Sequence, residues 1–277
     1  MTQLICCCPW WGLDHLGIEG MMAKIKGGGF DAVEIGVPKR HTDRSLLKRL
    51  LDLYDLKLVV HQYVATGNTA KEYIQSLRKE LEVAASFRPL VINSHTGKDY
   101  WDFEDGCRVF EEAEEIGQKY GVTIAHETHR GRLLYSAPVA RRYMEELEYL
   151  KINADFSHWV NVSESLLEDQ KDTMELAISR TEHTHARIGY AQGPQITDPR
   201  ASEWEKEINT FSYWWKRIME SFIRNERKFM TFSPEFGPYP YTVRHPFTLE
   251  PLSDPWSNNL YMKDQLKNMY NQISRTI

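Results

Sequence analysis

The sequence lacks the features that mark disulfide-rich, membrane and secreted proteins. Its 277 residues contain four cysteines, and three of them, Cys6, Cys7 and Cys8, are adjacent, so they form neither a disulfide framework nor a CxxC zinc motif. No apolar stretch approaches the length of a transmembrane helix. The start, MTQLICCCPWWG, has neither the basic region nor the long apolar region of a signal peptide. We therefore expect a cytoplasmic protein with buried, reduced cysteines and no membrane partner.

The sequence also has little excess charge of either sign. The formal net charge is −5, and 26% of the residues are charged, as in an ordinary globular protein. Such a chain has no overall attraction to the phosphates of nucleic acids. A Gly-rich phosphate turn after an early strand is missing too, because residues 27–29 (GGG) come before a predicted strand and read as a helix stop. We therefore expect neither a nucleic-acid partner nor a dinucleotide cofactor.

Short apolar runs alternate with helical patterns along the whole chain. The expected strands lie near residues 4–8, 32–36, 57–61, 90–94, 122–127, 152–155, 181–185 and 229–235. Runs such as LVV, LVIN and VTIA are almost continuously apolar, which is typical of parallel strands buried on both faces. Eight such units predict an α/β protein with one domain over residues 1–277, a (β/α)8 TIM barrel. A loop insertion near 189–202 is expected to act as a lid or binding loop at the barrel mouth.

Residues that can bind a metal or move a proton recur at the ends of these predicted strands. They are His61, His95, Glu127, Asp155, His185 and Glu235, and Glu34 extends the series towards the N-terminus. The separations from His61 to Glu235 are 34, 32, 28, 30 and 50 residues, so successive members belong to successive βα units. Reactive groups of TIM barrels come from the C-terminal ends of several strands. These side chains are therefore expected to form one site.

Four of these residues have the chemistry of a metal site. Glu127, Asp155 and Glu235 would supply carboxylates, and His185 an imidazole. This oxygen-rich set suits one divalent ion, Mn, Mg, Co or Zn, rather than copper or an iron–sulfur cluster. Carboxylates buried this close together would otherwise repel one another and take up protons. Each residue taken alone would more simply be a buried polar side chain that a neighbour satisfies.

The motifs around these residues resemble those of the xylose isomerase-like TIM barrels, also described as sugar phosphate isomerases and epimerases. The similarity rests on AHETH at Glu127, DFSH at Asp155 and His158, HTH ending in His185, and SPEFG at Glu235. The resemblance implies that Glu127, Asp155, His185 and Glu235 hold the metal and that His158 contacts the substrate. In the ketose 3-epimerases of this family, the two glutamates also act as acid and base.

The resemblance implies an isomerase or epimerase that acts on a sugar or polyol. The metal would polarise a substrate carbonyl, Glu127 or Glu235 would remove the neighbouring carbon-bound proton, and the metal would hold the enediolate. Return of the proton to the opposite face gives an epimer, and return to the next carbon gives an isomer. Ketose 3-epimerases share a further Glu and Arg where this sequence has Leu133 and Ala191, so the chain departs from that subgroup.

Aromatic and histidine side chains are expected to line the substrate pocket. Trp10 follows the first predicted strand and Trp101 follows the fourth, and their indoles could stack on sugar C–H faces or pack in the core. His61 and His95 are expected to form polar walls of the pocket, although they could also bind a second ion.

Arginines near the predicted strand ends could bind an anionic group such as a phosphate or carboxylate. Arg187 lies two residues after His185, a spacing that directs both side chains into the same pocket. Arg130 and Arg132 follow Glu127 and could serve the same purpose or belong to a solvated loop.

Two other functions compete with the isomerase. Endonuclease IV shares this barrel family and binds additional zinc with histidines that resemble His61, His95 and His158, which would make the protein a metal-dependent phosphoesterase. The Asp-x-His pair of those enzymes is missing after His185, where ARIGYAQGPQ follows. A barrel that binds carbohydrate without converting it is the other possibility. A homo-oligomer is also possible, because the stretch FSYWWKRIMESF could be an interface or a core helix.

Overall fold

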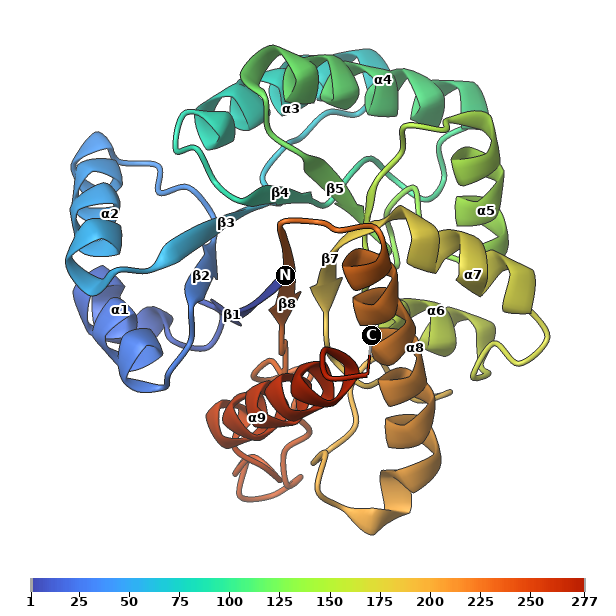
Figure 1. Cartoon of the computed structure of the whole chain (residues 1–277). Helices are drawn as coiled ribbons and strands as arrows, with labels where there is room; N and C mark the ends of the chain where they lie inside the picture. The colour runs from blue at the N-terminus through green and yellow to red at the C-terminus, as the bar shows by residue number, and fades with distance from the viewer. Residues whose placement is uncertain (1, 277) are drawn as a thin grey trace.

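The computed structural model describes residues 2–276, which form a closed barrel of parallel strands surrounded by helices (Figure 1). The strands are β1 Gln3–Pro9, β2 Ala32–Ile35, β3 Lys57–Gln62, β4 Val91–Ser94, β5 Ile124–Glu127, β6 Ile152–Asn153, β7 Thr181–His185 and β8 Phe229–Ser233. Each strand pairs in parallel with the next, and β1 closes the barrel against β8. The predicted (β/α)8 barrel is confirmed.

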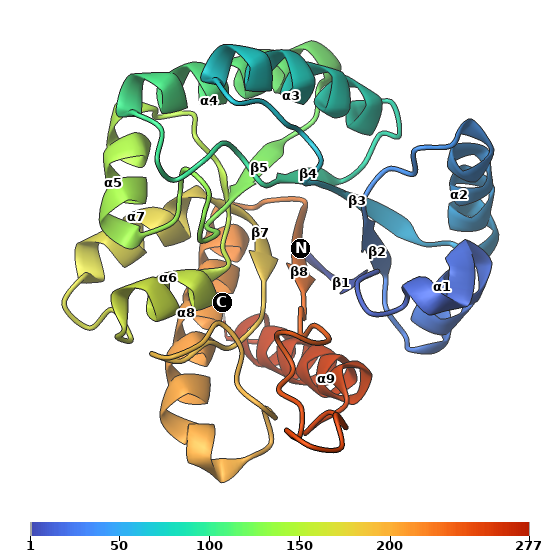
Figure 2. The ribbon, with the colours of Figure 1, turned by 180° about the vertical axis from the view of Figure 1, so that it is seen from behind.

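The helices surround the strands on all sides, as the two opposite views show (Figures 1 and 2). They are α1 Gly17–Gly27, α2 His41–Tyr54, α3 Ala70–Ala85, α4 Phe103–Tyr120, α5 Ala137–Glu146, α6 Phe156–Ser163, α7 Lys171–Arg180, α8 Glu205–Arg224 and α9 Pro255–Ile273. Local sequence explains their ends. Thr69 and Glu72 form a capping box at the start of α3, and Gly121 ends α4 in the left-handed conformation.

The three adjacent cysteines show how each strand contributes to two cores. Cys7 points into the barrel, where it packs with Ile5, Ala32, Val59, Val91 and Ala125. Cys6 and Cys8 belong to the larger core between the strands and the helices, because successive strand residues point to opposite faces. All three are buried and unpaired, as expected, and burial raises the pKa of Cys6 to about 12.

Two predicted strands end earlier than the sequence pattern indicates. β6 has only two residues, and its register with β7 shifts between Ile152 and Asn153. Asp155 lies beyond this strand because its carboxylate accepts a hydrogen bond from the Ser157 amide and caps α6. β8 ends at Ser233, so Glu235 also lies on a loop. Both acids therefore depend on side-chain contacts for their positions.

The aromatic-rich stretch FSYWWKRIMESF forms part of α8 and packs inward. Its buried residues are Phe211, Trp214, Trp215, Ile218, Met219 and Phe222. Of the two alternatives for this stretch, the core helix is therefore correct. The stretch gives no support for a homo-oligomer interface. No helix within residues 2–276 is both long and apolar enough to span a membrane.

Candidate active site

A cavity of about 380 Å³ lies at the C-terminal ends of the strands. It is lined by Pro9, Trp10, Trp11, Glu34, His61, Tyr63, His95, Glu127, His129, Arg132, Arg187, Glu235 and Tyr241. Its size is within the range of small-molecule sites. Trp101, a predicted pocket residue, lies outside this lining and packs against Tyr73 with ring centroids 5.2 Å apart.

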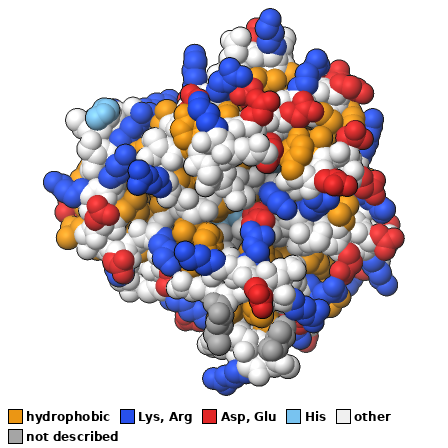
Figure 3. Space-filling view, turned by 45° about the horizontal axis from the view of Figure 1, so that its top comes forward, with side chains coloured by type: hydrophobic (Ala, Val, Ile, Leu, Met, Phe, Trp, Pro, Cys, Tyr) orange, Lys and Arg blue, Asp and Glu red, His pale blue; other side chains and the backbone are white. Residues whose placement is uncertain are grey.

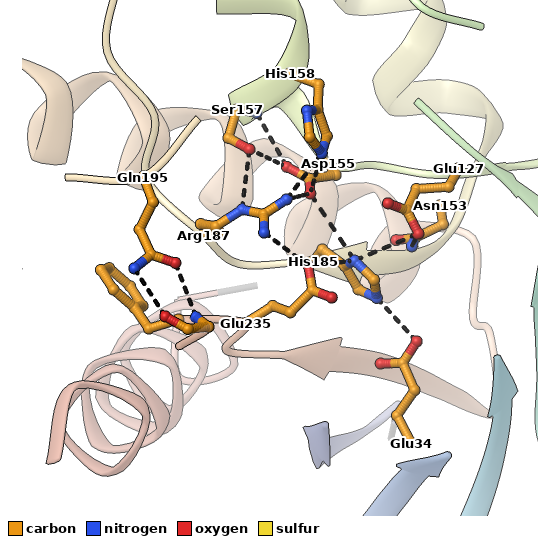
Figure 4. Close-up of polar contacts among 12 residues, drawn as sticks. Glu34, Glu127, Asn153, Asp155, Ser157, His158, His185, Arg187, Gln195 and Glu235 are labelled. Carbon is orange, nitrogen blue, oxygen red and sulfur yellow. Dashed lines mark hydrogen bonds and ion pairs between the residues drawn. The ribbon is translucent and has the colours of Figure 1, made fainter. Parts of the chain in front are cut away.

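His185 stands at the centre of the polar groups, and its two ring nitrogens face different partners (Figure 4). Its Nδ1 lies 2.8 Å from Glu235 Oε2, 3.6 Å from Glu127 Oε2 and 3.9 Å from Asp155 Oδ2. Its Nε2 lies 2.8 Å from Glu34 Oε1. The four residues predicted as metal ligands are thus brought together around one imidazole nitrogen.

Glu34, at the third position of β2, holds two histidines of β7. Its Oε1 is 2.8 Å from His185 Nε2, and its Oε2 is 3.2 Å from His183 Nε2. Asn93 Nδ2 donates a further hydrogen bond to Oε1 over 3.0 Å. Burial alone would raise the pKa of Glu34, but His185 and His183 outweigh it and hold this pKa well below its usual range. Ionised Glu34 is positioned to accept the Nε2 proton of His185, so Nδ1 is the ring nitrogen that would bind a cation after losing its own proton.

Three nitrogen atoms surround one carboxylate oxygen of Glu127, which lies at the end of β5. Asn93 Nδ2 and Asn153 Nδ2 donate to Oε2 over 2.8 and 3.3 Å, and His95 Nε2 lies 3.1 Å from the same atom. Burial would raise the pKa of Glu127, but His95 and His185 outweigh it and keep this pKa well below its usual range. Glu127 is therefore ionised at neutral pH, the form in which a carboxylate can accept a proton.

Asp155 and Arg187 form a buried ion pair beside this group (Figure 4). The Ser157 amide donates to Asp155 Oδ1 over 3.1 Å, and the Arg187 guanidinium donates to Oδ2. Arg187 also lies 3.5 Å from Glu235 Oε2 and 2.9 Å from His158 Nε2. Burial raises the pKa of Asp155 to about 6, although Arg187 offsets part of the rise. Arg187 is thus directed into the predicted pocket but is already paired with an acid.

Glu235 is held in place although it lies beyond β8. Two side-chain amides bind the backbone that follows it, each through both of its polar atoms. Gln195 accepts from the Gly237 amide over 2.8 Å and donates to the Gly237 carbonyl over 3.2 Å. Asn259 does the same with Phe236 over 2.8 and 3.0 Å. The insertion near 189–202, which contains Gln195, therefore anchors the segment that carries Glu235.

The donor set fits a divalent cation. Glu127, Asp155 and His185 offer ligand atoms that all lie within 4.8 Å of one another. His185 Nδ1 and Glu235 Oε2 are buried and close, yet neither makes a hydrogen bond within the described residues. Burial would lower the pKa of His185, but Glu235, Glu34 and Glu127 hold it well above its usual range. A divalent cation at the position that Nδ1 faces would offset this negative charge in place of the proton that the raised pKa indicates.

Four other histidines form two smaller groups near Glu127, and three of them, His61, His95 and His129, line the cavity, whereas His158 is fully buried and lies outside the lining. One group is His61, His95 and Glu127 and the other is Glu127, His129 and His158, each with ligand atoms within 4.8 Å of one another. Burial, reinforced by His95, lowers the pKa of His61 to about 4, so this imidazole is neutral. Neutral imidazoles can donate hydrogen bonds to a ligand or bind a second ion.

A closed (β/α)8 barrel with carboxylates and imidazoles gathered at its strand ends defines a TIM barrel with a candidate metal centre. The family model described as xylose isomerase-like TIM barrel matches residues 22–197, and the chain belongs to this family. No curated protein matches the sequence significantly.

Several solved structures share the fold at low sequence identity. A D-tagatose 3-epimerase-like protein is 16% identical, with a TM-score of 0.63 over 97% of this chain and 98% of its own. Endonuclease IV from Thermus thermophilus is 13% identical, with a TM-score of 0.57 over 97% and 99%. A xylose isomerase-like TIM barrel protein from Mycobacterium smegmatis, in complex with magnesium, is 9% identical, with a TM-score of 0.61 over 90% and 88%.

Proposed function

We propose that the protein is a divalent-metal-dependent isomerase or epimerase that moves a proton on a sugar or polyol. The convergence of Glu127, Asp155 and Glu235 on His185 Nδ1, beside the cavity that Glu127 and Glu235 line, carries the proposal. The likeness to a D-tagatose 3-epimerase-like protein and to a magnesium complex supports it.

The proposed reaction assigns a separate role to the metal, to the two glutamates and to the residues that hold them. A bound divalent ion would polarise the substrate carbonyl and ease loss of the neighbouring carbon-bound proton. Glu127 and Glu235 both line the cavity and are the candidate bases, one to remove a proton and the other to return it. Asn93 and Asn153 hold Glu127 by donating to its Oε2, which leaves the carboxylate ionised. Either glutamate can take either role, and the face or carbon that receives the proton decides between epimer and isomer.

Exchange with solvent deuterium tests this chemistry. Ketoses and aldoses incubated with Mn²⁺-loaded protein in heavy water should gain deuterium at the reacting carbon, detected by NMR. Glu127→Gln or Glu235→Gln keeps an oxygen ligand but cannot accept a proton, so either should abolish exchange while part of the metal binding survives. Glu112→Gln, which removes an acid paired with Arg78 outside the cavity lining, should exchange normally. A sugar converted without deuterium uptake would refute proton transfer through solvent-exchanging glutamates.

The phosphoesterase is the second candidate, because two histidine groups adjoin Glu127 and endonuclease IV has a similar structure. Positive and negative side chains are mixed over the face shown in Figure 3, without the continuous basic surface that favours nucleic acid. Hydrolysis of a phosphodiester together with two or three ions at full occupancy would favour this candidate. A barrel that only binds carbohydrate would instead keep its ligand in both glutamine variants and show no exchange with any sugar.

A further inference from the structure

Arg132 lines the cavity but has no partner for its charge. The residue is half-buried, and its guanidinium makes no ion pair or hydrogen bond with any other residue among 2–276. The other two arginines near the strand ends have partners. Arg187 is paired with Asp155, and exposed Arg130 donates to Asn161 over 3.3 Å. Arg132 is therefore the arginine of this group that is free to bind a ligand.

The backbone around Arg132 is fixed on both sides. The Arg132 amide donates to the His129 carbonyl over 3.1 Å, and the Leu133 amide donates to the Thr96 carbonyl over 3.0 Å. Leu133 is buried and packs so closely on Gly97 that a Cβ there would lie 2.5 Å from its side chain. The guanidinium thus extends from a well-anchored loop at the cavity wall.

A half-buried guanidinium without a partner loses part of its hydration and gains nothing in return. Its planar fork matches a carboxylate in two parallel charge-assisted hydrogen bonds. A monoanion would balance its single charge. A phosphate dianion would add surplus negative charge to a cavity whose lining already includes Glu34, Glu127 and Glu235.

We propose that the substrate is an acidic sugar, a keto sugar with a carboxylate that Arg132 binds. This inference rests on the proposed function. It places the substrate's carboxylate at the end of the molecule away from the reacting carbons. The cavity of about 380 Å³ is near the lower end of the size range for ligand sites, which suits one monosaccharide unit.

Calorimetric titration of the Mn²⁺-loaded protein with three compounds that differ only at C6 tests the proposal. They are D-fructose, D-fructuronate and D-fructose 6-phosphate, and the same series built on D-tagatose provides a second ring configuration. The uronate should bind at least about tenfold more tightly than the neutral sugar. Arg132→Gln should remove this difference without changing the affinity for the neutral sugar. Arg142→Gln, an exposed arginine on α5 outside the cavity lining, should keep it.

Each outcome bears on the proposal separately from the proposed function. Three results overturn the carboxylate assignment. They are tightest binding of the phosphate, equal binding of uronate and neutral sugar, and no binding of uronate in either series. Preservation of the uronate preference in Arg132→Gln overturns the role of Arg132. Deuterium exchange measured in the same samples reports on the proposed function alone. A uronate preference that depends on Arg132 without any exchange would support the inference and contradict the isomerase.

Discussion

Replacing Glu34 should weaken metal binding although Glu34 is not one of the predicted ligands. Its carboxylate accepts from Asn93 and lies 2.8 Å from His185 Nε2 and 3.2 Å from His183 Nε2. Glu34→Ala removes all of these contacts and leaves His185 free to rotate or to protonate Nδ1, the atom that faces the other acids. Loss of such supporting contacts typically lowers metal affinity about 10–100-fold, or roughly 1.4–2.7 kcal/mol of binding free energy.

Glu34→Gln separates the charge from the hydrogen bonds. The amide oxygen can still accept from His185, while its NH2 group then faces His183. His183 can move its proton to Nδ1, because Thr231 Oγ1 lies 2.7 Å from that atom and a hydroxyl can accept as well as donate. Glutamine thus keeps the contacts and removes one negative charge. Its loss of affinity should lie near tenfold, the lower end of the range for such contacts.

Titration of chelator-stripped protein with Mn²⁺, followed by calorimetry, measures both variants, and circular dichroism verifies that they fold. Glu112→Gln is the matched control, since Glu112 is a mostly buried acid paired with Arg78 away from the cavity. Wild-type affinity in folded Glu34→Ala would refute the view that Glu34 orients His185. A larger loss in Glu34→Gln than in Glu34→Ala would refute the tautomer argument for His183.

Three further outcomes are expected. Wild-type protein should hold about one divalent ion per chain, measured by elemental analysis. Asp155→Ala should lose most of this ion, whereas His95→Ala should retain it. Loss of two or three ions together in His95→Ala would contradict the single-metal site. Divalent ion at 100 times its dissociation constant should stabilise the native state by about 2.7 kcal/mol and raise its Tm by roughly 5 °C or more, and an unchanged Tm in calorimetric scans would argue against tight binding. Iodoacetamide should modify Cys107 in the native protein before the three buried thiols of β1, whose pKa values burial raises; mass spectrometry that finds the β1 thiols modified first would contradict their burial.

The fold could be predicted because every repeat carries the same signal. Strands such as β4 are buried on both sides and therefore appear as continuous apolar runs, and α4 buries Val109, Phe110, Ala113 and Ile116 at helical spacing. The pattern failed where capping competed with strand pairing. The run KINAD predicts a strand through Asp155, but Asp155 caps α6, and β6 ends at Asn153.

The site could be predicted only in part, because sequence spacing reveals strand ends but not contacts across the barrel. The four proposed ligands do meet, and their roles stay predictions. The supporting polar residues were missed. Asn93 donates hydrogen bonds to both Glu34 and Glu127, but it lies in an apolar run whose pattern indicates only a buried strand. Gln195 lies in a loop that the sequence predicts as a lid, but its amide anchors the backbone after Glu235.

The polar interior of this barrel gathers several acids in one buried region. Glu34, Glu127, Asp155 and Glu235 are all buried, and Arg187 is the guanidinium that pairs with two of them. Buried acids of like charge destabilise a fold unless they take up protons or bind cations. The neutral amides of Asn93 and Asn153 stabilise the charged form of Glu127 without cancelling the charge. A divalent ion would offset this negative charge, and under the proposed function Glu127 and Glu235 would lie beside it as proton carriers.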